Sequence, residues 1–174
     1  MKTWRIELLE WVKALLFAVI LALFIRVFLV ATYVVDGHSM QPSLHDYERV
    51  LINKVVYRFS PPSTGDVIVF EYPLDRARDF IKRVVAIPGQ TVEVKNGKVF
   101  IDGVALSEPY LITPTHGLFG PVTVPKNTVF VMGDNRNFSL DSRDPSVGFV
   151  PIKSIRGKGM VIFWPLSALK LIPH

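Results

Sequence analysis

The feature that most restricts this sequence is an apolar run near its N-terminus. Residues 14–25 contain no polar side chain, Arg26 interrupts the run, and residues 27–31 continue it. The stretch Trp11–Ala31 has the roughly 20 residues that a helix needs to cross a bilayer. A charge at mid-bilayer costs about 2.5–3.5 kcal/mol on insertion scales, but the long stem of Arg26 can carry its guanidinium to the far headgroups. The run therefore predicts one membrane-spanning helix.

The residues that flank this run predict how the helix is used. A cleaved export signal would fit the length, but the bulky sequence Tyr33-Val34-Val35 follows where small residues would mark a cleavage site. We therefore favour a retained anchor over a cleaved signal or a buried core helix. Basic residues before the run predict a single-pass protein of the cytoplasmic membrane, with its N-terminus inside and its long domain on the outer face. These basic residues are Lys2, Arg5 and Lys13.

Downstream of the anchor the pattern changes to short β-like runs. We expect an N-terminal stub and anchor over residues 1–35 and a β-rich extracytoplasmic domain over residues 36–174. Val-, Ile- and Phe-rich runs separated by turn residues predict a mainly β fold with many short strands. The predicted strands are Arg49–Val56, Asp66–Tyr72, Phe80–Ile87, Thr91–Val94, Val99–Ile101, Thr128–Met132 and Gly159–Phe163.

Three further segments carry a local prediction. Asn96-Gly97 between two alternating runs predicts a tight β-hairpin. The segment Ser107–Pro125, which Pro and Gly interrupt, is expected to be an irregular loop. The apolar stretch Phe163–Leu166 fits either the core or a contact with lipid headgroups, and we favour the core.

Composition excludes several classes of function. The 174 residues include no cysteine, which excludes disulfides, thiol catalysis and cysteine-ligated zinc or iron–sulfur sites. The net charge of +5 suits anionic lipid headgroups or nucleic acid. No basic stripe with interleaved aromatic residues indicates nucleic-acid binding. We therefore expect the bilayer as a partner, and no nucleic acid, metal or cofactor.

A serine shortly after the predicted span is the first candidate for chemistry. Ser39 lies in the sequence GHSMQPSL, and a serine hydroxyl needs a base before it attacks a carbonyl. His38 is adjacent, but neighbours in an extended chain point to opposite faces. No GxSxG elbow is present, because Gln41 stands in place of the second glycine. A Ser-His-Asp triad therefore has little support, since the other histidines lie in apparent loops. These are His45, His116 and His174.

A lysine in the sequence FIKRVVAIPG is the second candidate. On a strand, Lys82 shares an otherwise apolar face with Phe80 and Val84. Burial can lower the pKa of a lysine from about 10.4 to about 5–6, which makes its amine a usable general base. From the pattern alone, a solvated lysine at a strand edge is the simpler interpretation. Arg83 lies on an equally apolar face, so periodicity does not choose between the two.

A polar segment, Gly133–Arg143, directly follows the predicted strand Thr128–Met132. Its spacing does not fit a calcium-binding loop, because Arg136 and Phe138 occupy the third and fifth positions. Its Asp and Arg residues are consistent with either a plain solvated loop or an ion-pair network that braces a site.

These motifs, in this order behind one anchor, resemble the bacterial type I signal peptidases (leader peptidases), the Ser/Lys enzymes that remove signal peptides from exported proteins. The resemblance covers nearly the whole chain and includes a further motif, GDVIVF at Gly65–Phe70. It implies a membrane-bound serine endopeptidase that cleaves after small residues at Ala-x-Ala sites. Its partners would be signal peptides of secreted preproteins, the bilayer and a secretion translocase nearby. Gly37, where some members carry a hydroxyl residue, resembles the Gram-positive-like subgroup.

The resemblance also implies roles for single residues. Ser39 would be the nucleophile, with its backbone amide as an oxyanion donor, and Lys82 would be the general base. Ser139 would orient the Lys82 amine by a hydrogen bond. Two scaffold ion pairs would join Asp134 to Arg83 and Asp141 to Arg143. The residues that would line the small-residue pockets are Tyr33, Val35, Leu44 and Ile81.

Two other functions fit parts of the pattern. A Ser/Lys self-cleaving regulator shares the dyad and a β-rich fold, but it needs a DNA- or partner-binding segment where this chain has a membrane span. A non-catalytic, membrane-anchored binding domain is the other alternative. The presence of both Ser39 and Lys82 argues against it.

Overall fold

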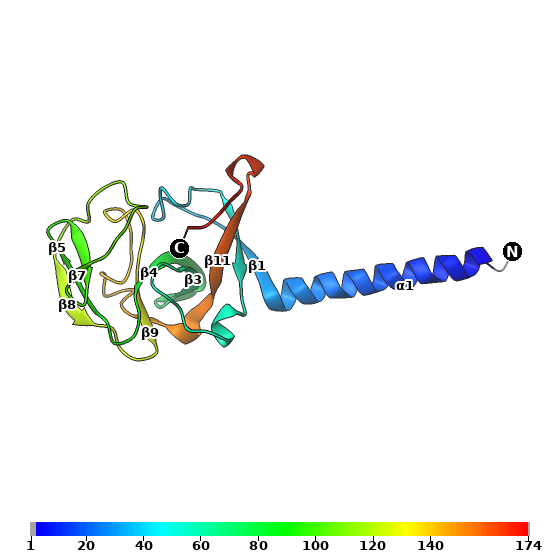
Figure 1. Ribbon diagram of the computed structural model, residues 1–174, viewed down its shortest axis with the longest axis horizontal. Helices are drawn as coiled ribbons and strands as arrows, with labels where there is room; N and C mark the ends of the chain where they lie inside the picture. The colour runs from blue at the N-terminus through cyan, green and yellow to red at the C-terminus, as the bar shows by residue number, and fades with distance from the viewer. Residues whose placement is uncertain (1–2, 174) are drawn as a thin grey trace.

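The computed structural model describes residues 3–173, so that Lys2, the side chain of Arg5 and His174 lie outside it. A long helix projects from a β-rich body, with the N-terminus at the far end of the helix (Figure 1). Helix α1 (Thr3–Phe24) continues into a π-helical turn, η1 (Ile25–Leu29). Among the described residues one helical stretch, Glu7–Leu29, is long and apolar enough to cross a bilayer, with a mean hydropathy of 2.6.

Strand β1 (Val30–Val34) carries the chain from this helix into a sheet without a loop. It pairs antiparallel with β2 (Arg49–Asn53) along its whole length. The predicted boundary at residue 35 therefore falls after a strand that already belongs to the body. In the sequence, the apolar residues of β1 cannot be told from a continuation of the membrane span. Only the pairing with β2, about 20 residues further along the chain, identifies them as a strand.

Within the described range, the body consists of an eight-stranded and a four-stranded sheet. Neighbouring strands of the larger sheet follow the order β1-β2-β11-β3-β4-β9-β10, with β12 paired to β11. The smaller sheet has the order β7-β6-β5-β8 and lies on the side of the body farthest from α1 (Figure 1). The remaining strands of the larger sheet are β3 (Val67–Tyr72), β4 (Asp75–Ala86), β9 (Thr128–Met132), β10 (Val150–Pro151), β11 (Ile155–Trp164) and β12 (Lys170–Leu171). Those of the smaller sheet are β5 (Thr91–Lys95), β6 (Lys98–Ile101), β7 (Val104–Ala105) and β8 (Phe119–Thr123), and the 3-10 turns are η2 (Val56–Arg58), η3 (Ile152–Ser154) and η4 (Leu166–Ala168).

The prediction of a mainly β fold is confirmed, and each predicted strand overlaps an observed one. The predicted hairpin joins β5 to β6, and Asn96 and Gly97 both have positive φ, as a tight two-residue turn requires. The irregular loop expected over Ser107–Pro125 is wrong for residues 119–123, which form β8 beside β5. Gly120 and Pro121 interrupt the alternation of apolar and polar residues by which a strand is recognised in the sequence. A side chain at Gly120 would collide with the Val92 carbonyl oxygen, so the close pairing itself requires glycine.

The core consists of three clusters of buried apolar side chains. One includes Met40, Leu44 and Ile162, next to the strands that follow the anchor. A second contains Val92 of the smaller sheet and Phe130 of the larger one, and so joins the two sheets. The third lies over β3, β4 and β9. The preference for a core position of Phe163–Leu166 is wrong for Trp164 and Leu166, which are 51% and 70% exposed.

Candidate active site

Ser39 lies in a short turn-rich segment directly after β1. Gly37 has a φ of +92°, which L residues rarely adopt, and its N–H donates to Oδ1 of Asp46 at 2.8 Å. The carbonyl oxygen of Ser39 accepts a hydrogen bond from the Asn135 N–H at 3.0 Å. The side-chain amide of Asn135 donates to the His38 carbonyl oxygen at 3.1 Å. Contacts from a distant loop therefore fix the backbone around Ser39.

Lys82 extends from β4 of the larger sheet to the loop that carries Ser39. Its Nζ donates a hydrogen bond to Ser39 Oγ at 2.7 Å and another to the Ile81 carbonyl oxygen at 3.0 Å. The centroid of the Phe80 ring, on the same strand face, is 5.2 Å from Nζ. Lys82 is only 4% exposed, so its amine has lost most of its contact with water.

This burial changes the acidity of the amine. Burial lowers the pKa of Lys82 from 10.5 to about 8, although the charges of Asp141 and Asp134 act to raise it. A pKa near 8 leaves about one tenth of the amine neutral at pH 7, compared with about 0.04% for a free lysine. The neutral amine can accept the proton of the serine hydroxyl, and Lys82 therefore has the chemistry of a general base.

Arg83 points away from this pair. It is fully buried, and its guanidinium forms a two-point ion pair with Asp134, at 2.8 and 2.7 Å. It also donates to the carbonyl oxygens of Gly65 and Pro173. The Tyr110 ring lies 4.1 Å from the guanidinium carbon. The structure therefore contains the expected Arg83–Asp134 ion pair, and it is Lys82, not Arg83, that contacts Ser39.

The polar segment Gly133–Arg143 forms a network of ion pairs rather than a solvated loop. Asp141 is buried, accepts the Gly133 N–H at 3.0 Å and binds Arg143 through both carboxylate oxygens at 2.8 Å. Arg136 pairs with Glu108 and donates to the Gly133 carbonyl oxygen. Both carboxylates near Lys82, those of Asp134 and Asp141, are thus already paired with an arginine.

Ser139 packs with Gly133 near the Ser39 backbone and does not form the expected hydrogen bond to Lys82. Its Oγ is buried and has no hydrogen-bond partner among the described residues. A side chain at Gly133 would collide both with this hydroxyl and with the Ser39 carbonyl oxygen, so the three groups are packed together. The orienting role of Ser139 stays a prediction.

A cavity of about 280 Å³ opens beside the dyad. Ser39 and Lys82 both line it, and so do three of the four expected pocket residues, Tyr33, Val35 and Ile81. Leu44, the fourth, is not among the lining residues. It is fully buried in the core because the chain turns helically there, with its N–H donating to the Met40 carbonyl oxygen at 2.9 Å.

Sequence reasoning missed several lining residues. Phe80 could have been found, because it shares a strand face with Lys82. The others come from elements that only the fold brings together. The missed residues are Val34, Asp36, Val69, Arg78, Asp79, Phe80 and Leu140. No histidine in the described part of the chain lines the cavity, and His38 Nδ1 lies 3.2 Å from Nε2 of Gln41 instead.

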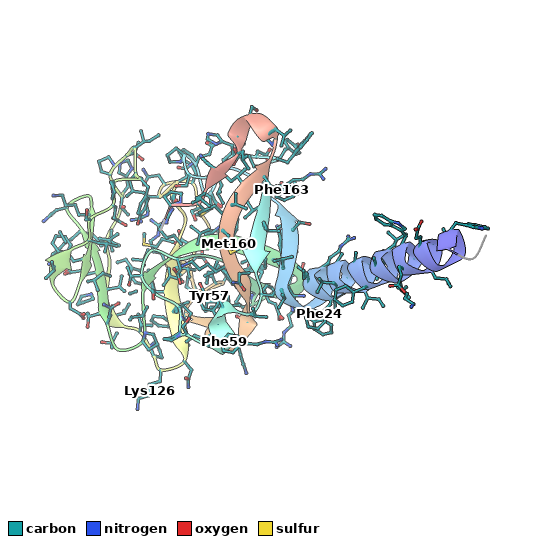
Figure 2. The ribbon with its side chains drawn as sticks, turned by 45° about the vertical axis from the view of Figure 1, so that its right-hand side comes forward. Phe24, Tyr57, Phe59, Lys126, Met160 and Phe163 are labelled. Carbon is teal, nitrogen blue, oxygen red and sulfur yellow. The ribbon has the colours of Figure 1, made fainter. Side chains whose placement is uncertain are left out.

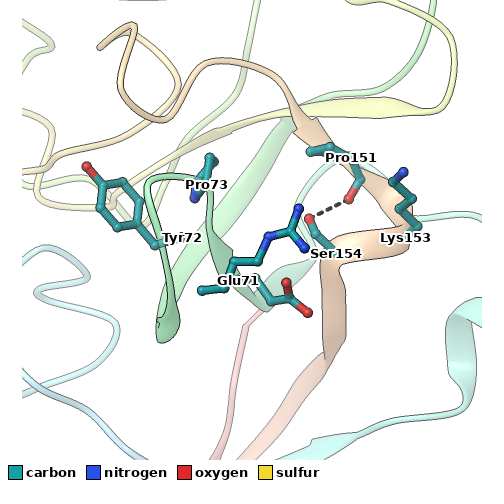
Figure 3. Close-up of a pocket in the computed structure, with 7 residues that line it drawn as sticks. Glu71, Tyr72, Pro73, Pro151, Lys153 and Ser154 are labelled. Carbon is teal, nitrogen blue, oxygen red and sulfur yellow. Dashed lines mark hydrogen bonds between the residues drawn. The ribbon is translucent and has the colours of Figure 1, made fainter.

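A second serine and lysine line a separate cavity of about 320 Å³ near the end of β3 (Figure 3). There the Ser154 hydroxyl donates to the Pro151 carbonyl oxygen at 2.7 Å, and not to the neighbouring Lys153 (Figure 3). This cavity does not repeat the arrangement of Ser39 and Lys82.

Known proteins resemble this chain over most of its length. Residues 8–164 match the family described as signal peptidase, peptidase S26. Signal peptidase I S of Bacillus subtilis (strain 168) is 41% identical over 175 aligned positions, covering 94% of this chain and 93% of the relative. Signal peptidase I of Leptolyngbya laminosa is 39% identical, covering 93% and 82%. A crystal structure of a signal peptidase I from Enterococcus faecalis V583 matches with a TM-score of 0.51 at 33% identity, covering 57% of this chain and 97% of that one.

Proposed function

Because the chain belongs to the signal peptidase family, peptidase S26, we propose that it is a membrane-bound serine endopeptidase that removes signal peptides from exported preproteins. The observation that carries the catalytic part of the proposal is the 2.7 Å hydrogen bond between Lys82 Nζ and Ser39 Oγ, at the wall of a cavity. Both residues have further bonds to the protein, Ser39 through its carbonyl oxygen to the Asn135 N–H and Lys82 through Nζ to the Ile81 carbonyl oxygen.

The proposed reaction proceeds through an acyl-enzyme. Neutral Lys82 takes the Ser39 proton as Oγ attacks the carbonyl carbon of the scissile peptide bond. The carbon–nitrogen bond then breaks, and the Lys82 ammonium returns its proton to the leaving amine. Lys82 next takes a proton from a water molecule, whose oxygen attacks the ester. The ester bond breaks, and Ser39 recovers its proton from Lys82.

Backbone donors around Ser39 support stabilisation of the developing oxyanion. The Ser39 N–H has no hydrogen-bond partner within residues 3–173 and is free to bind a substrate oxygen. The Gly37 N–H is already bound to Asp46 and supplies no second donor.

The shape of the cavity supports a preference for small residues, as at Ala-x-Ala sites. Apolar side chains of Val35, Val69 and Ile81 line it beside the dyad and restrict the space next to the scissile bond. Lys82 lies in the same wall and is only 4% exposed, so the surroundings that would select small residues also lower the pKa of the proposed base to about 8.

The anchor supports a site at the membrane surface. The apolar span ends at Leu29, only ten positions before Ser39. A precursor keeps its own apolar segment in the bilayer, so its cleavage site emerges at a similar height. Tethering both partners to one surface raises their effective concentration. In this proposal the N-terminus is inside, residues 36–174 work on the outer face of the cytoplasmic membrane, and the secretion translocase delivers precursors nearby.

Cleavage of a defined precursor tests the proposal. The protein, reconstituted in lipid vesicles, should cut a precursor after an Ala-x-Ala site. Both Ser39→Ala and Lys82→Ala should lower the rate by about 10⁴-fold or more, while the exposed-site control Lys126→Ala retains it. Cleavage of the enzyme's own chain alone would favour a self-cleaving regulator. No cleavage of either chain would favour a binding domain.

The pH dependence of kcat/KM tests the role of Lys82 in the same assay. Because only the neutral amine accepts a proton, the rate should rise with pH and level off above an acid limb centred near the Lys82 pKa of about 8. An acid limb centred near 10.5, the value of an exposed lysine, would contradict a buried general base.

A further inference from the structure

The helical segment ends in two hydrogen bonds to one residue of the body, Lys54. Turn η1 ends at Leu29, where the Val30 N–H closes the turn on the Ile25 carbonyl oxygen. The last carbonyl groups of a helix have no partner within the helix. Lys54 satisfies two of them here. Its N–H donates to the Leu29 carbonyl oxygen at 2.9 Å, and its Nζ donates to the Val27 carbonyl oxygen at 2.6 Å.

The position of Lys54 is itself fixed by the residues around it. Asn53, the last residue of β2, lies opposite Val30 in the ladder. Its side-chain Oδ1 accepts the N–H groups of Val55 at 2.9 Å and Val56 at 3.1 Å, which closes the turn after β2. In Figure 2, Phe24 marks the end of α1, and Tyr57 and Phe59 mark the segment that follows Lys54.

A cation at this place is favourable for two physical reasons. The carbonyl end of a helix carries partial negative charge, which attracts an ammonium group. An unsatisfied carbonyl also costs more free energy as water becomes scarce toward the hydrocarbon. The apolar span ends at Leu29, so the Lys54 contact lies at this boundary.

No free hinge separates the anchor from the nucleophile. β1 follows η1 directly and is paired residue by residue with β2, from Val30 to Val34. Beyond it, Gly37 and Ser39 are bonded to Asp46 and Asn135. A five-residue strand spans about 17 Å. The distance between Ser39 and the end of the helix is therefore fixed by the fold, provided that the bonds from Lys54 keep the helix in place against β2.

We propose that Lys54 is a positioning residue that locks the membrane anchor to the catalytic domain, so that Ser39 reaches only cleavage sites at one distance from the precursor's own apolar segment. The part of this inference that concerns substrate choice rests on the proposed function. The locked junction itself is independent of peptidase activity and can be measured separately.

A distance measurement tests the junction. Since the chain has no cysteine, spin labels can be placed uniquely at Val19→Cys in α1 and Lys98→Cys in β6 of the full chain in vesicles. Pulsed EPR should give one narrow distance distribution for the parent and for Lys54→Arg, and a broader one for Lys54→Met, which keeps the backbone bond to Leu29 but loses the Nζ bond to Val27. The control Lys126→Met, at an edge of the body away from α1 (Figure 2), should stay narrow. A broad parent distribution, or a Lys54→Met distribution as narrow as the parent's, overturns the proposal.

A substrate series tests the consequence. Precursors are lengthened by two, four or six residues between apolar segment and cleavage site. The parent should prefer one length. Lys54→Met should weaken this length preference and lower kcat/KM for the best precursor by about threefold to tenfold. Its cleavage of a short soluble peptide should be unchanged. Lys54→Arg should show the same length preference as the parent. A flat parent profile, or equal losses on peptide and precursor, contradicts positioning. If the parent cleaves neither substrate, the proposed function fails, and the EPR result still decides whether Lys54 locks the junction.

Discussion

The ammonium of Lys82 shows how surroundings set the chemistry of one side chain. Burial lowers its pKa to about 8, even though Asp141 and Asp134 lie close enough to raise it. Each of these carboxylates is paired with an arginine, Arg143 or Arg83. The pairing limits the attraction that would otherwise hold the proton on Lys82. The two ion pairs thus affect the acidity of Lys82 as well as the structure of the loop.

Replacing Lys82 by methionine should stabilise the fold. The pKa of about 8 lies below the 10.5 of an exposed lysine, so the unfolded chain binds more protons between these pH values. The folded state therefore carries a penalty that is complete below pH 8 and disappears as pH rises through 10.5. We expect Lys82→Met to raise the free energy of unfolding at pH 7 by up to about 3 kcal/mol, measured by denaturant titration. A gain that persists unchanged above pH 10.5 would contradict this origin.

The segment after β9 and the loop after β1 pack together at Gly133. Gly133 bridges them: its N–H donates to Asp141 at 3.0 Å, and its Cα faces the Ser39 carbonyl oxygen and the Ser139 hydroxyl. Glycine is required at position 133 because there is no space for a Cβ atom, whereas its φ angle is one that other residues also adopt. Two loops from distant parts of the chain therefore set the position of Ser39.

Gly133→Ala should displace the loop that carries Ser39. The added methyl group would collide with the Ser39 carbonyl oxygen, and a displacement of about 1 Å in a reacting group can cost 10²-fold in rate. We expect kcat/KM to fall by about 10²-fold or more. The matched control is Gly159→Ala, where the nearest atom is the flexible Ile172 Cδ1 at 3.0 Å. Equal activity of the two variants would show that the loop yields without moving Ser39.

The buried Arg83 connects segments that lie far apart in the sequence, from Ser43 to Pro173. Its guanidinium binds Asp134 after β9, the Gly65 carbonyl oxygen before β3, the Ser43 hydroxyl in the loop that carries Ser39, and the Pro173 carbonyl oxygen. β4 lies between β3 and β9 in the larger sheet. Because neighbouring residues of a strand point to opposite faces, Lys82 lines the cavity and Arg83 binds these partners. The proposed general base and the buried ion pair therefore come from a single strand.

Asp134→Asn should destabilise the whole body, because it leaves the Arg83 guanidinium buried without a counter-charge. Removing one partner of a buried pair costs about 3–5 kcal/mol. Thermal or denaturant unfolding measures this loss. The control Glu93→Gln removes one partner of the more exposed pair with Lys95 and should cost less than about 1 kcal/mol. Similar small losses in both variants would mean that Arg83 finds another partner or water.

Much of the site could be anticipated from the family resemblance that the motifs carry. The motifs singled out Ser39 and Lys82, and the structure brings them into contact. The two expected ion pairs are present. Leu44 lies in the core, and Ser139 forms no bond to Lys82, because a side chain's direction depends on the turn or loop in which it sits. Asn135 and Lys54 were missed because their bonds join backbone atoms far away in the sequence.

The amino-acid sequence by itself determined the apolar helix, the mainly β class and the hairpin at Asn96-Gly97. Each of these follows from local causes: the length of an apolar run, the alternation of β-branched side chains and the backbone preferences of turn residues. Only the tertiary structure decided that Val30–Val34 is a strand, that Lys82 rather than Arg83 faces Ser39, and that Lys54 meets the end of the anchor. These outcomes depend on contacts between residues at least 15 positions apart in the sequence, whose free energies do not follow from any local sequence pattern.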